Sequence, residues 1–123
     1  MQSKDGFFIG RIKSIKYAFK GFFILITTEH SVRAQFFVLL ACVGLGIYLQ
    51  ISPYEWMAKI LAFGLIFTAE SLNTAIEEIA NFIHPEYHKH IGKIKDIAAG
   101  AVTFAALTTF IVLCFIYLPK FFA

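Results

Sequence analysis

The sequence has little charge and few of the residues that break helices or form disulfides. Charged residues make up 15% of the 123 residues, and the chain holds only 3 prolines and 2 cysteines. Hydrophobic residues make up 59%, and the mean hydropathy is +0.72. A water-soluble domain of this length could not bury so much apolar surface, so a soluble globular class is excluded. We expect a single integral membrane domain over residues 1–123.

The two cysteines, Cys42 and Cys114, lie in apolar stretches. That placement favours packing and argues against a disulfide or a cysteine metal site. The sequence also lacks the phosphate-binding G-x-x-x-x-G-K-[ST] loop and the Gly-rich loop of protein kinases. A nucleotide, if one is used, must therefore be held by helix faces and loops. No cleavable signal peptide is expected, because basic residues interrupt the first apolar stretch.

The apolar pattern predicts an all-α integral membrane protein with one surface helix and three transmembrane helices. In the first segment apolar residues recur every three or four positions, while Lys13, Lys16 and Lys20 fall on another face. This pattern indicates a basic amphipathic helix in the membrane interface, with packing on a soluble partner as the alternative. Three later stretches have the length and apolarity of membrane spans, and residues 84–96 form a polar connection. The expected bounds are about 7–28 for the surface helix and about 34–51, 55–83 and 96–118 for the spans.

Basic residues predict the orientation of these spans. They crowd the N-terminal segment and the polar connection, so both are expected in the cytoplasm, with the turn at Ser52 and the C-terminus facing outward. Lys59 is the exception, and its long side chain is expected to snorkel from the outer end of the second span. The residues that set the orientation are Lys4, Arg11, Lys13, Lys16, Lys20, Lys89, Lys93 and Lys95.

A line of polar side chains follows one face of the second predicted span. It consists of Glu70, Asn73, Thr74 and Glu77, which stand at helical steps of three and four, and we refer to it as the polar stripe. A carboxylate at bilayer depth is costly unless it faces a bundle interior, pairs with another group or takes part in chemistry. For Thr74 and the neighbouring Glu78, a hydrogen bond within the bundle is the favoured reading.

The expected topology also gathers charged side chains at the cytoplasmic edge, namely Glu29, Glu77, Lys95 and Asp96, with Glu70 about two turns deeper. Glu29 and Glu77 could hold a hard cation such as Mg²⁺, and Lys95 could meet a phosphate. Glu70 could act as a general base toward a lipid hydroxyl, with Asn73 orienting the reacting groups. Metal, phosphate and base together indicate phosphoryl transfer to a membrane lipid alcohol.

Other functions remain open at this point. A small oligomeric membrane transporter also places a carboxylate inside a short span, although it would not need the cytoplasmic cluster. A structural assembly subunit is a third possibility. The histidines His84, His88 and His90 suggest zinc at first sight, but solvated interface histidines are the favoured interpretation.

Two segments resemble the signature segments of the small bacterial diacylglycerol kinase and undecaprenol kinase family. They are Glu70-Ser-Leu-Asn-Thr-Ala-Ile-Glu77 and Lys95-Asp-Ile-Ala-Ala-Gly-Ala-Val102. The likeness runs from about Arg11 to Val102, and it includes Tyr17-x-x-Lys20-Gly21 and Glu29-x-x-x-Arg33. The combination of E-x-L-N-[ST]-A-I-E with a K-D pair some 18 residues later is highly specific.

The resemblance implies an ATP- and Mg²⁺-dependent kinase of lipid metabolism in the bacterial cytoplasmic (inner) membrane. It would phosphorylate undecaprenol or diacylglycerol, giving undecaprenyl phosphate or phosphatidic acid, and it would be a homotrimer with active sites shared between subunits. Glu70 would be the catalytic base beside Asn73, and Glu29 and Glu77 would be the metal ligands. Glu70 and Ala99 would contact the lipid. The residues implied for ATP binding are Arg11, Tyr17, Glu29, Glu77, Glu86, Tyr87, His88, Lys95 and Asp96.

Two positions depart from the family pattern. Asn81 stands where the family commonly has aspartate, which puts a charge-dependent role there in doubt. Diacylglycerol-specific members often read G-S-A-A after the K-D pair, whereas this chain reads Ile97-Ala-Ala-Gly-Ala. That ending is closer to the undecaprenol kinase branch.

Overall fold

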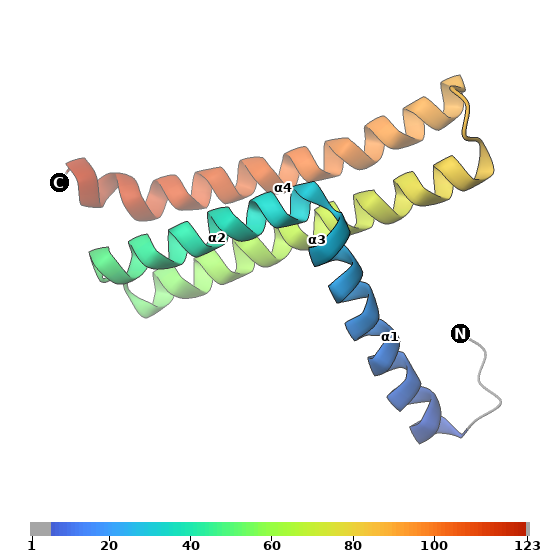
Figure 1. The fold of residues 1–123 in the computed structure, drawn as a ribbon. Helices are drawn as coiled ribbons and strands as arrows, with labels where there is room; N and C mark the ends of the chain where they lie inside the picture. Colours follow the sequence, from blue (N-terminus) through green and yellow to red (C-terminus); the bar gives the residue numbers. More distant parts are fainter. Residues whose placement is uncertain (1–5, 123) are drawn as a thin grey trace.

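The computed structural model describes residues 6–122, and these residues form four helices (Figure 1). Three of the helices are long and apolar enough to cross a membrane, which confirms the predicted all-α class with three candidate spans. Lys4, one of the residues used to predict orientation, lies outside the described part of the chain. The helices are α1 (Phe7–Thr28), α2 (His30–Leu49), α3 (Pro53–Ile83) and α4 (Lys89–Phe122).

The α3 and α4 helices lie side by side along most of their length and form the main packing interface (Figure 1). One buried cluster joins Phe63 and Ile66 of α3 to Ala105 of α4. In the same region the Thr109 hydroxyl of α4 donates a hydrogen bond to the backbone carbonyl of Ala62 over 3.1 Å. Small residues let the two backbones approach closely, as in other membrane helix pairs. The polar stripe lies on α3, so the packing of α3 against α4 holds it in place.

The α2 helix runs along α3, whereas α1 leaves the bundle (Figure 1). The change of direction occurs at Glu29, a single extended residue with φ −96° and ψ 116° between the two helices. None of the 22 described residues of α1 is buried, and Arg11 lies over the ring of Phe7. A helix that keeps its apolar face uncovered in this way needs a membrane or another subunit to cover it.

The turn from α2 to α3 is short because local signals end one helix and begin the next. Gln50 takes a left-handed conformation with φ 53° and caps the C-terminal end of α2. Ser52 then accepts a hydrogen bond from the Glu55 amide, while the Glu55 carboxylate accepts one from the Ser52 amide. This capping box, followed by Pro53 at the first helical position, fixes the start of α3.

The α4 helix is longer than the pattern predicted at both ends. It begins at Lys89, so the connection is confined to residues 84–88 instead of reaching residue 96. Gly92 is the only strong helix breaker between residues 89 and 96, so the helix extends N-terminally beyond the apolar stretch. At the other end α4 passes through Pro119 to Phe122, where Lys120 forms an ion pair with Glu55 of α3 at 3.3 Å.

The expectation that Lys59 snorkels to the interface is wrong. Its residue exposure is 2%, and its ammonium donates hydrogen bonds to the Cys42 carbonyl and, over 2.7 Å, to the Tyr117 hydroxyl. The Trp56 ring lies 4.5 Å from the ammonium, measured to its centroid. The three long helices thus supply acceptors and a π face inside the bundle, which removes the need to reach water.

Candidate functional site

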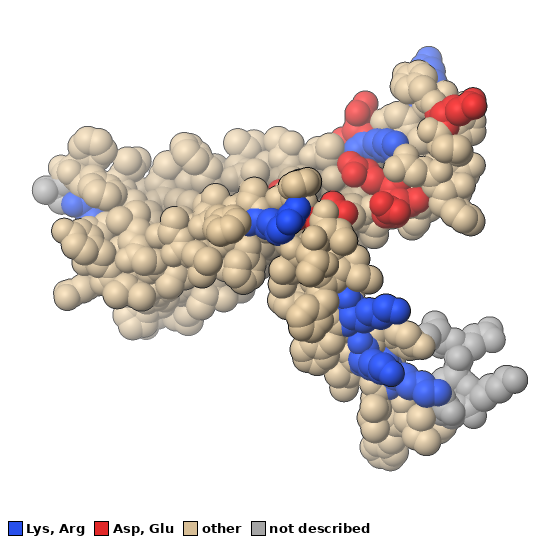
Figure 2. All heavy atoms as spheres, viewed as in Figure 1, with Lys and Arg blue, Asp and Glu red and all other residues tan. Residues whose placement is uncertain are grey.

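The polar stripe runs from a buried position in α3 to an exposed one. Glu70 is buried, Asn73 and Thr74 are half-buried, and Glu77 is exposed. Acidic side chains gather at the end of the bundle where α3 meets α4, while basic side chains line α1 (Figure 2). The stripe therefore connects the apolar middle of the bundle to a charged, accessible end, as a site for a lipid and a water-soluble substrate requires.

Glu70 is only partly satisfied by the protein. The side chain of Gln35 on α2 lies near its carboxyl group. The Oε2 atom of Glu70 is buried and has no hydrogen-bond partner among residues 6–122. A buried polar atom without a partner costs free energy, so its retention points to a group that is bound during function.

Asn73 sits beside Glu70 on the stripe and is held from one side. Its Nδ2 donates a hydrogen bond to Oε1 of Glu77 over 3.3 Å, one turn further along α3. Its Oδ1 is buried and, within the described part of the chain, has no partner. Two neighbouring stripe residues thus each present an unpaired oxygen, which could accept hydrogen bonds from a substrate hydroxyl or a bound water.

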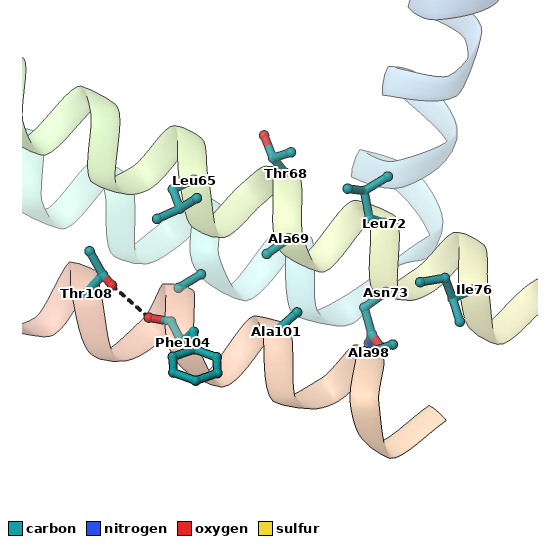
Figure 3. A pocket seen from close by; sticks show the side chains of 11 residues that line it. Leu65, Thr68, Ala69, Leu72, Asn73, Ile76, Ala98, Ala101, Phe104 and Thr108 are labelled. Carbon is teal, nitrogen blue, oxygen red and sulfur yellow. Dashed lines mark hydrogen bonds between the residues drawn. The ribbon is translucent and has the colours of Figure 1, made fainter. Parts of the chain in front are cut away.

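Asn73 also lines a groove between α3 and α4, which we call the apolar groove (Figure 3). The groove has a volume of about 380 Å³, and Asn73 lies near one end of it, close to Ala98. Its other walls are apolar apart from two threonines, so it suits a hydrocarbon chain or an apolar helix. The lining residues are Leu65, Thr68, Ala69, Leu72, Asn73, Ile76, Ala98, Ala101, Phe104, Ala105 and Thr108.

Lys95 and Asp96 point in different directions at the start of α4. The Lys95 ammonium crosses to α3 and donates a hydrogen bond to Oδ1 of Asn81 over 2.7 Å. Asp96 instead lines a pocket of about 480 Å³ beside the loop, together with Tyr87, Lys89, His90, Gly92 and Lys93. Lys95 and Asp96, which were both predicted to contact the nucleotide, thus lie on different sides of the first turns of α4.

The 84–88 loop carries three further residues that were predicted to bind the nucleotide. They are Glu86, Tyr87 and His88, and all three are exposed. The His84 ring nitrogen lies 2.6 Å from the Glu86 carbonyl oxygen. The rings of His84 and His88 meet edge to face, with centroids 5.2 Å apart. The Tyr87 ring packs over Gly92, where a Cβ would lie 3.3 Å from it. The loop is therefore folded back on itself and on α4, with Glu86, Tyr87 and His88 close together.

The structure does not bring every predicted site residue to the end of the bundle where α3 meets α4. Arg11 and Tyr17 are exposed on α1, which departs from the bundle (Figure 1), and Glu29 is half-buried at the corner that leads into α2. Within residues 6–122, no group of three or more histidine, cysteine or acidic side chains is arranged to hold a metal ion. Ala99 is exposed and does not line the apolar groove, although its neighbour Ala98 does.

Sequence reasoning missed Gln35 and the contact that Asn81 makes. Gln35 is the one amide within the apolar residues 34–49, and such an isolated polar residue in a span signals an interhelical partner. The helical step from Glu77 to Asn81 is also four, so Asn81 lies on the face of the polar stripe.

Comparison with known proteins identifies the family of the chain. The family model for prokaryotic diacylglycerol kinase matches residues 16–117. An undecaprenol kinase from Bacillus subtilis is 37% identical over 110 residues, which cover 88% of this chain and 88% of that protein. A diacylglycerol kinase from Escherichia coli K12 is 28% identical over 110 residues, covering 89% and 90%. With its three candidate spans and its glutamate-bearing stripe, the chain belongs to the prokaryotic diacylglycerol kinase family, which is a family of lipid kinases.

Proposed function

We propose that this protein transfers the γ-phosphate of ATP to the hydroxyl group of a membrane lipid alcohol, undecaprenol or diacylglycerol. The products would be ADP and undecaprenyl phosphate or phosphatidic acid. The observation that carries the proposal is the buried Glu70 carboxylate, whose Oε2 has no partner within residues 6–122, on a stripe that leads to the charged end of the bundle. Family membership supplies the reaction class.

Glu70 acts as the general base in this proposal. The lipid hydroxyl oxygen attacks the γ-phosphorus, the bond from that phosphorus to the β–γ bridging oxygen breaks, and the hydroxyl proton passes to Glu70. Asn73 orients the hydroxyl through its free Oδ1, while its Nδ2 remains bonded to Glu77. A base that is already placed and shielded from bulk water loses little in reorganisation during the reaction.

Two carboxylates, one on the stripe and one outside it, offer the oxygen ligands that Mg²⁺ prefers. Glu77 offers carboxylate oxygens, only one of which accepts the bond from Asn73, and Glu29 is a half-buried carboxylate at the α1–α2 corner. These two would hold Mg²⁺, which when bound neutralises charge on the phosphates of ATP. The remaining nucleotide contacts would come from Arg11 and Tyr17 of α1, Glu86, Tyr87 and His88 of the loop, and Lys95 and Asp96 of α4.

A homotrimer with shared active sites fits the exposed surfaces of the protomer. The apolar groove and the outer faces of all four helices leave many large apolar side chains uncovered, among them Leu72 and Phe104 beside the groove. In addition, α1 carries Arg11 and Tyr17 away from the loop of its own protomer (Figure 1). A neighbouring subunit could receive them and complete the site. We place this assembly in the bacterial inner membrane, with the N-terminus and the 84–88 loop in the cytoplasm.

The identity of the lipid substrate is tested by comparing phosphorylation of the two candidate lipids. Purified protein in mixed micelles receives labelled ATP and Mg²⁺ with either undecaprenol or diacylglycerol. We expect label in undecaprenol, because identity to the undecaprenol kinase is higher and residues 97–101 resemble that branch. Label only in diacylglycerol would reverse that choice. Label in neither, together with ATP-independent solute transport into proteoliposomes, would support the transporter instead.

A further inference from the structure

The imidazole ring of His88 caps the N-terminal end of α4, where the 84–88 loop joins α3 to α4 (Figure 1). His88 precedes Lys89, the first residue of the helix, and its carbonyl oxygen accepts a hydrogen bond of 2.8 Å from the Gly92 amide. The backbone N–H of His90 donates a second hydrogen bond to Nδ1 of the His88 ring over 3.1 Å. The first amides of a helix lack partners within the helix, and a side-chain acceptor at this position satisfies one of them.

This capping bond requires one protonation state of the ring. Nδ1 of His88 accepts only when it carries no proton, so the ring must be neutral, with its proton on Nε2. An imidazolium carries a proton on both nitrogens and cannot accept. It would also place a positive charge at the positive end of the helix dipole. His84 differs, because its Nδ1 lies 2.6 Å from the Glu86 carbonyl oxygen and donates in the neutral and the charged state alike.

The nearest side chains oppose a positive charge on His88. The centroid of the His84 ring, at the end of α3, lies 5.2 Å from that of His88, and the His90 ring stacks on His88 at 5.6 Å. Residues 89–92, the first turn of α4, include no acidic residue. Within residues 6–122, no carboxylate forms an ion pair with His88. The charged and titratable side chains at this end of the bundle are Glu77, Glu78 and His84 of α3, Glu86 and Tyr87 of the loop, and Lys89, His90, Lys93, Lys95 and Asp96 of α4.

We propose that His88 is a pH-sensitive cap: the neutral ring holds the first turn of α4 and the 84–88 loop together, and protonation of Nδ1 releases them. The Tyr87 ring packs over Gly92 in that turn, so the release also loosens Tyr87. Histidine is the side chain whose charge ordinarily changes between about pH 5 and 8, so the cap responds within that range. The consequence for the nucleotide rests on the proposed function, in which Glu86 and Tyr87 contact ATP, and it is a KM for ATP that rises as the pH falls.

Hydrogen exchange of the purified protein in detergent micelles, without nucleotide or lipid, tests the cap directly. Each rate is divided by the intrinsic exchange rate at the same pH. We expect protection of the His90 amide to fall about fivefold as the pH is lowered from about 8 to about 5.5, since loss of an N-cap has roughly this effect. His88→Asn supplies an acceptor that does not titrate in this range, and its protection should stay high at both pH values. In His88→Ala protection should be low at both.

An equal pH response in the wild type and in His88→Asn would overturn the proposal. His90→Gln is the matched control, because it removes a titrating ring, keeps the backbone donor and should retain the fall in protection. Loss of that fall in His90→Gln would assign the response to His90 and overturn the role of His88. The Ala105 amide, in the buried middle of α4, reports on the fold and should not change.

The two proposals fail separately, because exchange is measured without ATP or lipid. A pH-dependent cap in a protein that phosphorylates no lipid would reject the proposed function alone. A KM for ATP that stays constant while protection falls would overturn the link between the cap and the nucleotide.

Discussion

The Lys59 ammonium of α3 donates a hydrogen bond of 2.7 Å to the Tyr117 hydroxyl of α4, in the half of the bundle away from the polar stripe. Both residues are buried, and both reach the carbonyl of Cys42 on α2. These three hydrogen bonds therefore join all three long helices. The internally satisfied polar group at Lys59 thus contrasts with the unpaired oxygens of Glu70 and Asn73.

Tyr117→Phe is expected to destabilise the protein more than Lys59→Met does. Removing the hydroxyl leaves the buried ammonium with one acceptor fewer, at a cost of about 1–3 kcal/mol. Replacing the lysine removes the charge together with its need for partners, and the Tyr117 hydroxyl keeps its bond to Cys42. Thermal unfolding in detergent compares the two variants, and a larger loss for Lys59→Met would contradict the expected order, because it would mean that the hydrogen bonds of the ammonium stabilise the bundle by more than burial of its charge costs.

Gly46→Ala should destabilise the α2–α3 contact. A Cβ at this position would stand 2.9 Å from Trp56 Cη2 and 3.0 Å from Lys59 Nζ. Overpacking of this kind costs about 1–3 kcal/mol. The control is Gly44→Ala on the same helix, where nothing lies within 4 Å and alanine should be neutral or stabilising. Melting curves of the two variants measure the difference, and equal stability would show that this packing is not tight.

Asn73→Leu should lower kcat about 100-fold with little change in the KM for ATP, because Asn73 faces the lipid end of the site and not the nucleotide end. Leucine preserves the volume but removes both the free Oδ1 and the bond to Glu77. Steady-state kinetics with ATP varied at saturating lipid separate the two constants. A rise in KM at unchanged kcat would assign Asn73 to nucleotide binding instead.

Glu77→Gln should raise the Mg²⁺ concentration needed for half-maximal activity by about tenfold or more. The change removes one of two proposed carboxylate ligands and retains the acceptor for Asn73. Glu78→Gln is the matched control on the next residue and should leave the Mg²⁺ dependence unchanged. Activity is titrated with Mg²⁺ after removal of bound metal by a chelator, and equal titration curves for the two variants would argue against Glu77 as a ligand.

Local periodicity predicted most of the fold. The apolar stretches, the Ser52-Pro53 break and the basic face of residues 7–28 follow from short-range chemistry, and the structure has helices in the corresponding places. The predicted ends of α4 were wrong. At the N-terminal end, the polar character of residues 89–95 indicated a connection, although these residues can continue a helix. Pro119 likewise read as a stop, but α4 continues through it to Phe122.

Contacts between helices could not be predicted from the sequence in the same way. The spacing of Glu70 and Asn73 places them on one face, and the structure confirms their proximity to the bundle interior. The pairing of Lys59 with Tyr117, or of Asn81 with Lys95, depends on the register between α3 and α4, which packing fixes and periodicity does not. Whether Glu29 approaches Glu77 depends further on the proposed assembly of subunits, so that part of the site stays a prediction.

The most direct measurement is transfer of labelled γ-phosphate from ATP to lipid by the wild-type protein and by Glu70→Gln, in parallel with ATP binding. Glutamine keeps the shape of the side chain but cannot accept the hydroxyl proton, so we expect turnover to fall by at least about 100-fold. Melting temperature and ATP affinity should stay close to wild type, because Glu70 lies about two turns from the charged end of the bundle. Wild-type rates of lipid phosphorylation by Glu70→Gln would contradict the central claim that Glu70 is the catalytic base.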